Sequence, residues 1–410
     1  MTAASPLKVV FLNRFYWPDL AATAQMLTDL AEDLAAMGWS VTVIANDSPY
    51  DGSGDRLPHE ESRNDVRILR VGGTNFGRHG LMGRVGAYAS YMFGSLRQVM
   101  MLPPQDVVVA MSDPPLLIAL AVLIARLRGW RCVYWVQDLF PQIAAELGVL
   151  ARRGLVYRLT ERFSRALNRT CDLTIALGPL MAERMTAAGV RKERIAFVHN
   201  WADTTAIRPI DPADNPFVAA HGLLGKFVVL YSGNAGRAHR FDGVLEAARL
   251  LRDDPDVIFL FIGGGKRLPE IRMAVADAQL RNVRFLDYLP REELAFSLSA
   301  ASLSLVTEEE SVNGLLVPSK TYGILASGRP IAFLGSGASD AATVVREANS
   351  GFVLPPGDGE QLSRIIRRLR DNARLGSELG DNGRQAATAF YGRKVSTTRW
   401  ADLVSAAVRP

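Results

Sequence analysis

The chain has little cysteine, no long apolar run and no spacing of Cys and His residues that suits zinc. Its two cysteines, Cys132 and Cys171, each lie in an apolar stretch that predicts a strand. We expect buried thiols rather than a disulfide, which favours a reducing cytosol. The longest apolar run, residues 116–125, is shorter than the roughly 20 residues that span a bilayer. The sequence therefore predicts a protein that does not cross a membrane.

The bulk composition is that of a globular protein with sizeable cores. Hydrophobic residues make up 48% of the 410 positions and charged residues 22%, so two domains are expected. The first residues lack the layout of a signal peptide, and Lys8–Asn13 already predicts a strand. We therefore expect a cytoplasmic protein.

Acidic residues are also missing from residues 66–105, although the net charge of the chain is only +5. This interval contains Arg84 among several arginines, aromatic residues and methionines, and a second basic stretch, residues 151–169, contains Arg158 and Arg162. Such segments predict docking on an anionic membrane; the alternative is a solvated basic face over an ordinary core stripe. Nucleic acid is not expected, because the aromatic residues do not form a stacking platform. The second stretch predicts a helix with four apolar residues on one face: Leu155, Leu159, Phe163 and Leu167.

Short apolar runs alternate with amphipathic segments along most of the chain. This pattern predicts parallel strands that helices cover on both faces, in two doubly wound α/β domains. A Pro- and Asp-rich segment near residues 201–222 predicts the linker. In the first half we expect strands at 7–13, 40–45, 66–71, 106–111, 131–136, 171–176 and 194–198, and helices at 22–37, 80–101, 115–128, 152–169 and 179–188. In the second half we expect strands at 226–231, 257–262, 283–287, 302–306, 330–334 and 351–354, with helices between and after them.

Two glycine-rich loops follow predicted strands in the second half. In YSGNAGRAHRFDGVLEAA, residues 231–248, a loosened turn is followed by Arg237 and Arg240 and then a helix. Backbone N–H groups and arginines at a helix start can bind a phosphate; the alternative is an ordinary turn with solvated arginines. In FIGGGKRLPEI, residues 261–271, three glycines permit close approach of a ligand to the backbone. The second loop is neither a Walker A nor a GxGxxG motif. A dehydrogenase is not expected, because the sequence has no strand–GxGxxG–helix unit.

A third segment, LVPSKTYGILASGRP, places a cation and a glycine in the first turns of a predicted helix. Lys320 opposes the positive end of the helix dipole unless an anion binds there, and Gly323 could make room for a nucleotide. The alternative is that Lys320 points into water. Three consecutive acids precede this segment, residues 308–310, and either bind sugar hydroxyls or form a solvated loop.

Loops in the first half could provide the acceptor side of a site. In YWVQDLFPQ, Asp138 follows an apolar strand and could accept a proton from a hydroxyl; the alternative is that it caps a helix near Pro141. The segment NRFYWPDLAATAQM, residues 13–26, lies between the first strand and the first long helix, where phosphate or acceptor groups would bind.

These segments, in this order, resemble the retaining glycosyltransferases of family 4, which have the two-domain GT-B fold. The resemblance rests on FYWPDLAATAQMLTDLAEDLAAMGWSVTVIA, VHNWADTTAIRPI, YSGNAGRAHRFDGVLEAA, NVRFLDYLPREELAFSLSAASLSLV and VPSKTYGILASGRP. Within this family, the chain most resembles bacterial enzymes of polysaccharide and O-antigen assembly, including L-fucosamine and colanic-acid fucosyl transferases. The resemblance implies two Rossmann-like domains facing across a cleft: an acceptor domain at 1–203, a donor domain at 204–390 and, at 391–410, a last helix that crosses back to the first domain.

The resemblance also implies roles for individual residues. The loops at 232–240 and 263–266 would hold the donor diphosphate together with Lys320, and the base would lie against Asp287–Leu289. Two departures matter: many relatives have a ribose-binding glutamate where Gly323 stands, and many have a glycine pair where Ala21 and Ala22 stand. The residues and the resemblance together assign the transfer chemistry to Asp138, Arg240, Lys320 and Glu309, donor binding to Gly233, Asn234, Arg237, Gly264, Lys266, Tyr288, Leu289, Glu310 and Ser319, and the acceptor or membrane side to Arg14, Tyr16, Ala21, Arg84, Arg158 and Arg162.

The sequence thus predicts a retaining glycosyltransferase that uses a nucleoside diphosphate sugar, with UDP the preferred nucleotide. The acceptor would be a polyprenyl-diphosphate-linked saccharide at the inner face of the cell membrane. No cofactor or metal is expected, because cations and helix N-termini replace it. The alternatives are a GDP-sugar transferase for fucose or mannose, a nucleotide-sugar epimerase or inverting transferase of the same fold, and a protein that only binds sugar or nucleotide.

Overall fold

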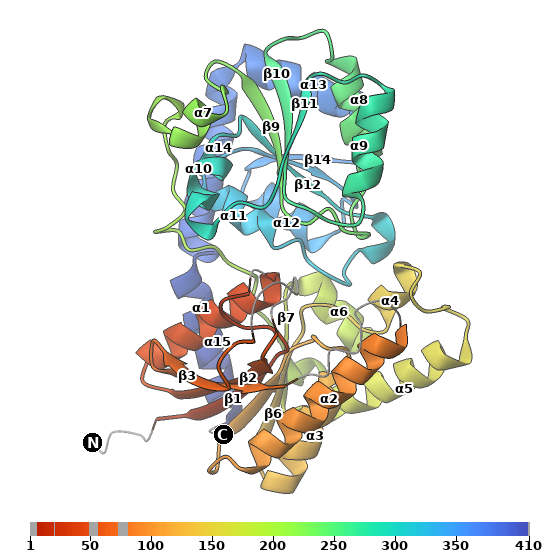
Figure 1. Ribbon diagram of the computed structural model, residues 1–410, viewed down its shortest axis with the longest axis vertical. Coiled ribbons are helices and arrows are strands. Elements are labelled where there is room, and N and C mark those ends of the chain that lie inside the picture. The colour runs from red at the N-terminus through yellow and green to blue at the C-terminus, as the bar shows by residue number, and fades with distance from the viewer. Residues whose placement is uncertain (1–5, 20, 49–55, 73–80, 409–410) are drawn as a thin grey trace. The chain divides into compact units, whose positions relative to one another are not determined.

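The computed structural model describes residues 6–19, 21–48, 56–72 and 81–408. They divide into two compact units, each built on a parallel sheet with helices on both faces (Figure 1). The first unit contains Met1–His199 and Ser396–Pro410, and the second contains Asn200–Val395. The predicted fold class of two doubly wound α/β domains is therefore confirmed.

The sheet of the first unit is parallel except for one edge strand. Its order is β3-β4-β2-β1-β5-β6-β7-β8, and β3 pairs antiparallel with β4. The strand order reverses between β1 and β5, which marks the edge where sheets of this kind bind ligands. The strands are β1 (Lys8–Leu12), β2 (Ser40–Asn46), β3 (Glu60–Arg63), β4 (Val66–Val71), β5 (Val107–Ala110), β6 (Arg131–Trp135), β7 (Leu173–Ala176) and β8 (Ile195–Phe197).

The last helix of the chain completes the first unit. Trp400 of this helix is fully buried, with its ring 5.6 Å from that of Phe11 and 6.0 Å from that of Trp135. Figure 1 shows α2, α3 and α5 side by side on one side of the sheet, and α1 and α15 on the other. The helices are α1 (Ala22–Ala36), α2 (Leu81–Met100), α3 (Leu117–Arg128), α4 (Gln142–Glu146), α5 (Leu155–Thr170), α6 (Pro179–Ala187) and α15 (Arg393–Val408).

The sheet of the second unit is parallel throughout, in the order β11-β10-β9-β12-β13-β14. Its strands are almost wholly apolar because helices cover both faces. The strands are β9 (Phe227–Ser232), β10 (Val257–Ile262), β11 (Val283–Leu286), β12 (Leu303–Thr307), β13 (Ile331–Leu334) and β14 (Gly351–Leu354). The helices are α7 (Pro216–Ala220), α8 (Asp242–Leu250), α9 (Leu268–Asp277), α10 (Leu294–Ser299), α11 (Lys320–Ala326), α12 (Asp340–Glu347), α13 (Gly359–Asp371) and α14 (Ala373–Phe390).

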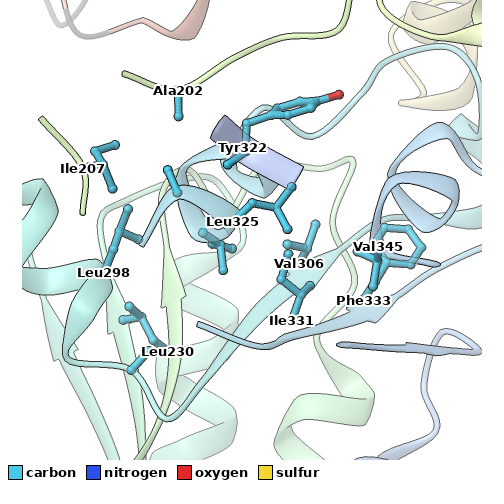
Figure 2. Close-up of a cluster of buried hydrophobic side chains, with 14 of the residues drawn as sticks. Ala202, Ile207, Leu230, Leu298, Val306, Tyr322, Leu325, Ile331, Phe333 and Val345 are labelled. Atoms are coloured by element: carbon cyan, nitrogen blue, oxygen red, sulfur yellow. The ribbon is translucent and has the colours of Figure 1, made fainter. Parts of the chain in front are cut away.

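Two apolar clusters fill the second unit, one on each face of its sheet. Leu303 and Leu305 of β12 point into one cluster, whereas Val306 points into the other, as the two-residue period of a strand requires. Figure 2 shows the latter cluster, in which Tyr322 and Leu325 of α11 pack over the strands. This packing fixes α11 against the sheet with Lys320 at its first position, beside the point where the strand order reverses between β9 and β12.

The structure differs from the sequence-based expectation mainly at short elements. Strand β3, with the sequence EESR, was not predicted, because its four residues are polar and carry no apolar period. Cys132 and Cys171 are buried free thiols, as expected. None of the helices among the described residues has both the length and the apolar character needed to cross a bilayer.

Candidate functional site

The second unit brings three predicted segments together at the carboxyl ends of its strands. The loops after β9 and β10 are locked to each other by backbone hydrogen bonds. Ala235 N donates to Gly264 O at 2.6 Å, and Arg267 N donates to Ala235 O at 2.9 Å. A Cβ at Gly263 would lie 2.4 Å from Gly233 O, and one at Gly265 would lie 2.4 Å from Ala235 O, both with positive φ. These glycines are therefore required by the close approach of the two loops.

Lys320 lies beside these loops with its charge buried. Its Nζ is 3.7 Å from the centroid of the Tyr231 ring, and it has no hydrogen-bond partner among residues 6–19, 21–48, 56–72 and 81–408. A Cβ at Gly233 would lie 3.6 Å from the same Nζ. Burial lowers the pKa of Lys320 from 10.5 to about 7, which corresponds to about 5 kcal/mol against the charged form. The alternative that Lys320 points into water is wrong.

His239 is a second titratable group with little access to solvent at this place, and the sequence did not single it out. Its Nδ1 lies 2.6 Å from the carbonyl oxygen of Thr307, which can only accept, so Nδ1 carries the proton. Burial, and then the charge of Lys320, lowers the pKa of His239 to about 3. His239 is therefore a neutral imidazole with an Nε2 lone pair available as an acceptor. The sequence could have identified His239 as a candidate, because this histidine lies in a loop that follows a predicted strand.

The three consecutive acids of residues 308–310 have three different environments. Glu310 is exposed, and Glu309 forms an ion pair with Arg267 at 3.2 Å. Glu308 is buried, and neither of its carboxyl oxygens has a hydrogen-bond partner within the described part of the chain. Burial, and then the nearby charge of Asp340, raises the pKa of Glu308 from 4.5 to about 8. Glu308 is therefore mostly protonated at neutral pH.

The predicted cations around the loop after β9 differ in their surroundings. Arg240 forms two hydrogen bonds of 2.7 Å to Asp242, so its charge already has a carboxylate partner. Arg237 is exposed, as are Asn234 and Lys266. Among the predicted donor-side cations, Lys320 therefore has the least compensated charge.

The remaining predicted donor residues lie around the same loops. The ring of Tyr288 lies 3.2 Å from a Cβ built at Gly263 and 3.0 Å from one built at Gly264, so it covers these glycines. Leu289 packs partly against the core, and Ser319 precedes α11 without capping it through its side chain.

Gly323 does not face the two glycine loops. A Cβ there would meet Leu298 at 3.5 Å and Ile207 at 3.9 Å, both members of the apolar cluster in Figure 2. The space beside Gly323 is therefore bounded by core side chains, and the expectation that it makes room for a nucleotide is not supported. The reason is that Gly323 lies on the face of α11 that packs toward α10 and the linker.

In the first unit, Asp138 is accompanied by a second carboxyl group. Asp113 follows β5 and Asp138 follows β6, and the Ser112 hydroxyl accepts hydrogen bonds from the backbone N–H groups of Gln137 and Asp138 at 3.0 and 3.1 Å. Burial raises the pKa of each carboxyl from 3.8 to about 6, and the charge of Asp113 adds to the effect on Asp138. The cap alternative is wrong, because Pro141 occupies the N-cap of α4 and no side chain caps it. Asp113 could have been found by the rule that selected Asp138.

The other predicted residues of the acceptor side lie around the end of β1. Arg14 N donates to Asp113 O at 3.0 Å, and its guanidinium lies 5.2 Å from the Tyr88 ring centroid. Tyr16 is buried, and burial raises the pKa of its hydroxyl. Ala21 occupies the N-cap of α1. The side chain of Arg84 lies outside the described residues.

Helix α5 presents an apolar and basic surface to solvent. Leu155, Leu159 and Phe163 are 71%, 56% and 49% exposed, and Arg158 and Arg162 are also exposed. The alternative of an ordinary core stripe is therefore wrong for these three apolar residues. The core side of α5 is formed instead by Tyr157, Ser164 and Asn168.

The chain matches two family descriptions in succession. Residues 22–201 match the Glycosyl transferase 4-like domain, and residues 217–386 match Glycosyl transferases group 1. The probable glycosyltransferase WbjE of Pseudomonas aeruginosa is 29% identical over 74% of each chain. WcaI of Escherichia coli K12, whose name assigns it provisionally to colanic acid biosynthesis, is 29% identical over 50% of this chain and 51% of its own length. Anabaena HepE, solved with UDP and glucose, superposes with a TM-score of 0.75 at 15% identity over 98% of this chain and all of its own.

Proposed function

Because the chain belongs to the glycosyltransferases of family 4 and has the GT-B fold, we propose that it transfers a sugar from a nucleoside diphosphate sugar, with UDP the preferred nucleotide, in bacterial surface polysaccharide assembly. One observation carries the donor part of the proposal. The ammonium of Lys320 is buried at the switch point of the second sheet, beside two glycine loops, without an anionic partner within the described residues. A phosphate is the ligand whose charge this arrangement lacks.

The transfer step follows from the charges that develop in it. The bond from the anomeric carbon to the β-phosphate oxygen breaks, and a bond from an acceptor hydroxyl oxygen to the same carbon forms with retention. Lys320 stabilises the charge on the leaving diphosphate, and the helix N-terminus of α11 adds to it. The hydroxyl proton passes to Asp138, whose raised pKa suits a base near neutral pH. No metal is required in this scheme, because protein groups compensate the phosphate charge.

The acceptor in this proposal is a polyprenyl-diphosphate-linked saccharide at the inner face of the cell membrane. The exposed leucines, phenylalanine and arginines of α5 support it, since apolar side chains interleaved with cations suit an anionic lipid surface. Membrane attachment would bring the enzyme to a lipid-anchored substrate, with no spanning helix needed.

The donor site is tested by thermal stabilisation with UDP, GDP and their sugars, with and without magnesium. We expect UDP without metal to raise the melting temperature of the wild type and to have little effect on Lys320→Met. Lys192→Met, which removes an exposed lysine of the first unit, should keep the response. A selective response to GDP would identify a GDP-sugar transferase, and no response to any nucleotide would contradict the donor assignment. With an active donor, product stereochemistry separates a retaining transferase from an inverting enzyme or an epimerase.

Membrane docking is tested with vesicles that contain anionic lipid. Changing Arg158, Arg162 and Arg165 to Ser should weaken binding markedly, because each basic residue near such a surface contributes about 1 kcal/mol. The matched control changes Arg364, Arg368 and Arg374 of the second unit to Ser, which removes the same charge from other exposed positions. Equal binding by the two triple variants would remove α5 from the proposal.

A further inference from the structure

Among the residues that the structure describes, no carboxylate offsets the burial of Lys320. Its Nζ is covered by the Tyr231 ring at 3.7 Å and lacks a hydrogen-bond partner in the described ranges. Burial is the cause of its lowered pKa, and no neighbouring acid offsets it. Burying an ammonium group without a partner costs free energy. In the ligand-free site the side chain of Lys320 is therefore neutral more often than that of an exposed lysine.

The titratable groups around Lys320 do not supply the missing charge. From β9 and the loop after it come Tyr231 and His239, and His239 stays neutral. At the start of α9 is Arg267, which pairs with Glu309 of the loop after β12 and with Glu270 of its own helix.

The elements packed against the rest of α11 add no charge at its first turn. Arg384 of α14 donates to the carbonyl of Ala326, at the opposite end of α11. From the sheet and α12 come Glu308, which is mostly protonated, and Asp340, whose charge acts on Tyr322 and Glu308. The tyrosines near the site, Tyr231 and Tyr322, have pKa values raised by burial and stay neutral.

We propose that the binding of the donor diphosphate is coupled to the uptake of one proton by Lys320. The inference rests on the proposed donor site and adds a property to it. In the free protein the side chain alternates between amine and ammonium near neutral pH. When the diphosphate binds, its negative charge stabilises the ammonium form of Lys320. The proton that Lys320 takes up comes from the buffer. His239 offers an acceptor and not a charge, so it does not compete for the anion.

The coupling has a magnitude that calorimetry can measure. With a free-state pKa of about 7, Lys320 is about 90% neutral at pH 8, so binding should take up about 0.9 proton there. The dissociation constant should rise about 15-fold between pH 7 and pH 8.5. The terminal phosphate of UDP, with a pKa of about 6, is about 99% ionised at pH 8 and does not itself take up the proton there.

The experiment is titration calorimetry of the full chain with UDP at pH 8, in buffers with different enthalpies of ionisation. The dependence of the observed enthalpy on that of the buffer gives the number of protons. We expect about 0.9 for the wild type and none for Lys320→Arg, because an arginine is always charged. His239→Asn should keep the uptake, because its amide can replace the Nδ1 donor and the proton goes to Lys320. Lys192→Met, at an exposed position of the first unit, should also keep it.

The outcomes separate the inference from the function on which it rests. Tight binding of UDP by the wild type without proton uptake at pH 8 would overturn the coupling and leave the donor site intact. Equal uptake by wild type and Lys320→Arg would assign the proton to another group and would also overturn it. If no nucleotide binds at pH 6 or pH 8, both the inference and the donor site are wrong.

Discussion

Glu308 offers a stability experiment that depends on the second unit alone. Its side chain is buried at the end of β12, and its two carboxyl oxygens have no hydrogen-bond partner in the described part of the chain. Gly335 lies beside Glu308, since a Cβ built at Gly335 would lie 3.1 Å from the Cβ of Glu308. We therefore choose Glu308→Gln, which keeps the shape of the side chain and removes its ability to ionise.

The size of the effect follows from the pKa of Glu308, which rises from 4.5 in the unfolded chain to about 8 in the folded protein. Between these values the folded state holds a proton that the unfolded state has lost, so the free energy of unfolding falls as pH rises. The full shift corresponds to about 5 kcal/mol, of which about 3 kcal/mol is lost between pH 5 and pH 7.5. The amide of the Glu308→Gln variant has no proton to lose, so the variant lacks this part of the pH dependence.

Urea unfolding followed by far-ultraviolet circular dichroism, at pH 5 and at pH 7.5, measures this difference. The stability of Glu308→Gln relative to the wild type should rise by about 3 kcal/mol between the two pH values. The test is the change in the free energy of unfolding between the two pH values and not its absolute size. An unpaired amide can lower stability at both pH values by about 1–3 kcal/mol. Glu310→Gln, at an exposed position, should show no such pH dependence. Parallel pH profiles of wild type and Glu308→Gln would mean that folding does not raise the pKa of Glu308.

Two further predictions concern the site. Gly265→Ala should lower the melting temperature by several degrees and weaken UDP binding, because its Cβ would lie 2.4 Å from Ala235 O at a φ of +128°. The control Gly236→Ala should change little, because a Cβ there would have only Asn234 within 4 Å. Asp138→Asn should lower the rate of transfer to an acceptor by about 10²- to 10⁴-fold without changing UDP binding. Asp113→Asn should shift the rise of the transfer rate to lower pH, since the charge of Asp113 helps to raise the pKa of Asp138. Unchanged kinetics in both variants would exclude a role for these two carboxyl groups.

The repeated elements of the fold could be predicted because parallel strands covered on both faces are nearly continuous apolar runs. Residues 257–262 and 351–354 show this, since the predicted and observed bounds coincide. Strand β3 could not be predicted, because its four residues are polar and its pairing with β4 depends on the neighbouring strand. The period of α5 predicted a helix, but a period does not tell whether its apolar face is covered, and here Leu155 and Phe163 are exposed.

The candidate site was predictable at the level of loops and not of individual charges. The rule that ligands bind beyond the carboxyl ends of strands selected the segments that contain Lys320 and Asp138. It did not reveal that Arg240 is paired with Asp242 two residues later, or that three consecutive glutamates differ so strongly. Such differences arise from burial and from neighbours distant in sequence, as with Glu309 and Arg267.

Two titratable groups that we assign to the transfer reaction predict how its rate depends on pH. Asp138 must be ionised to accept a proton, and the pair with Asp113 titrates near pH 6, so the rate should rise as pH increases through 6. Lys320 must be charged to receive the diphosphate, and its pKa of about 7 in the free protein makes kcat/KM for the donor fall above pH 7. At saturating donor the bound diphosphate keeps Lys320 protonated, so kcat should stay level where kcat/KM falls. A kcat/KM that is flat from pH 7 to pH 8.5 would contradict the protonation of Lys320 on donor binding.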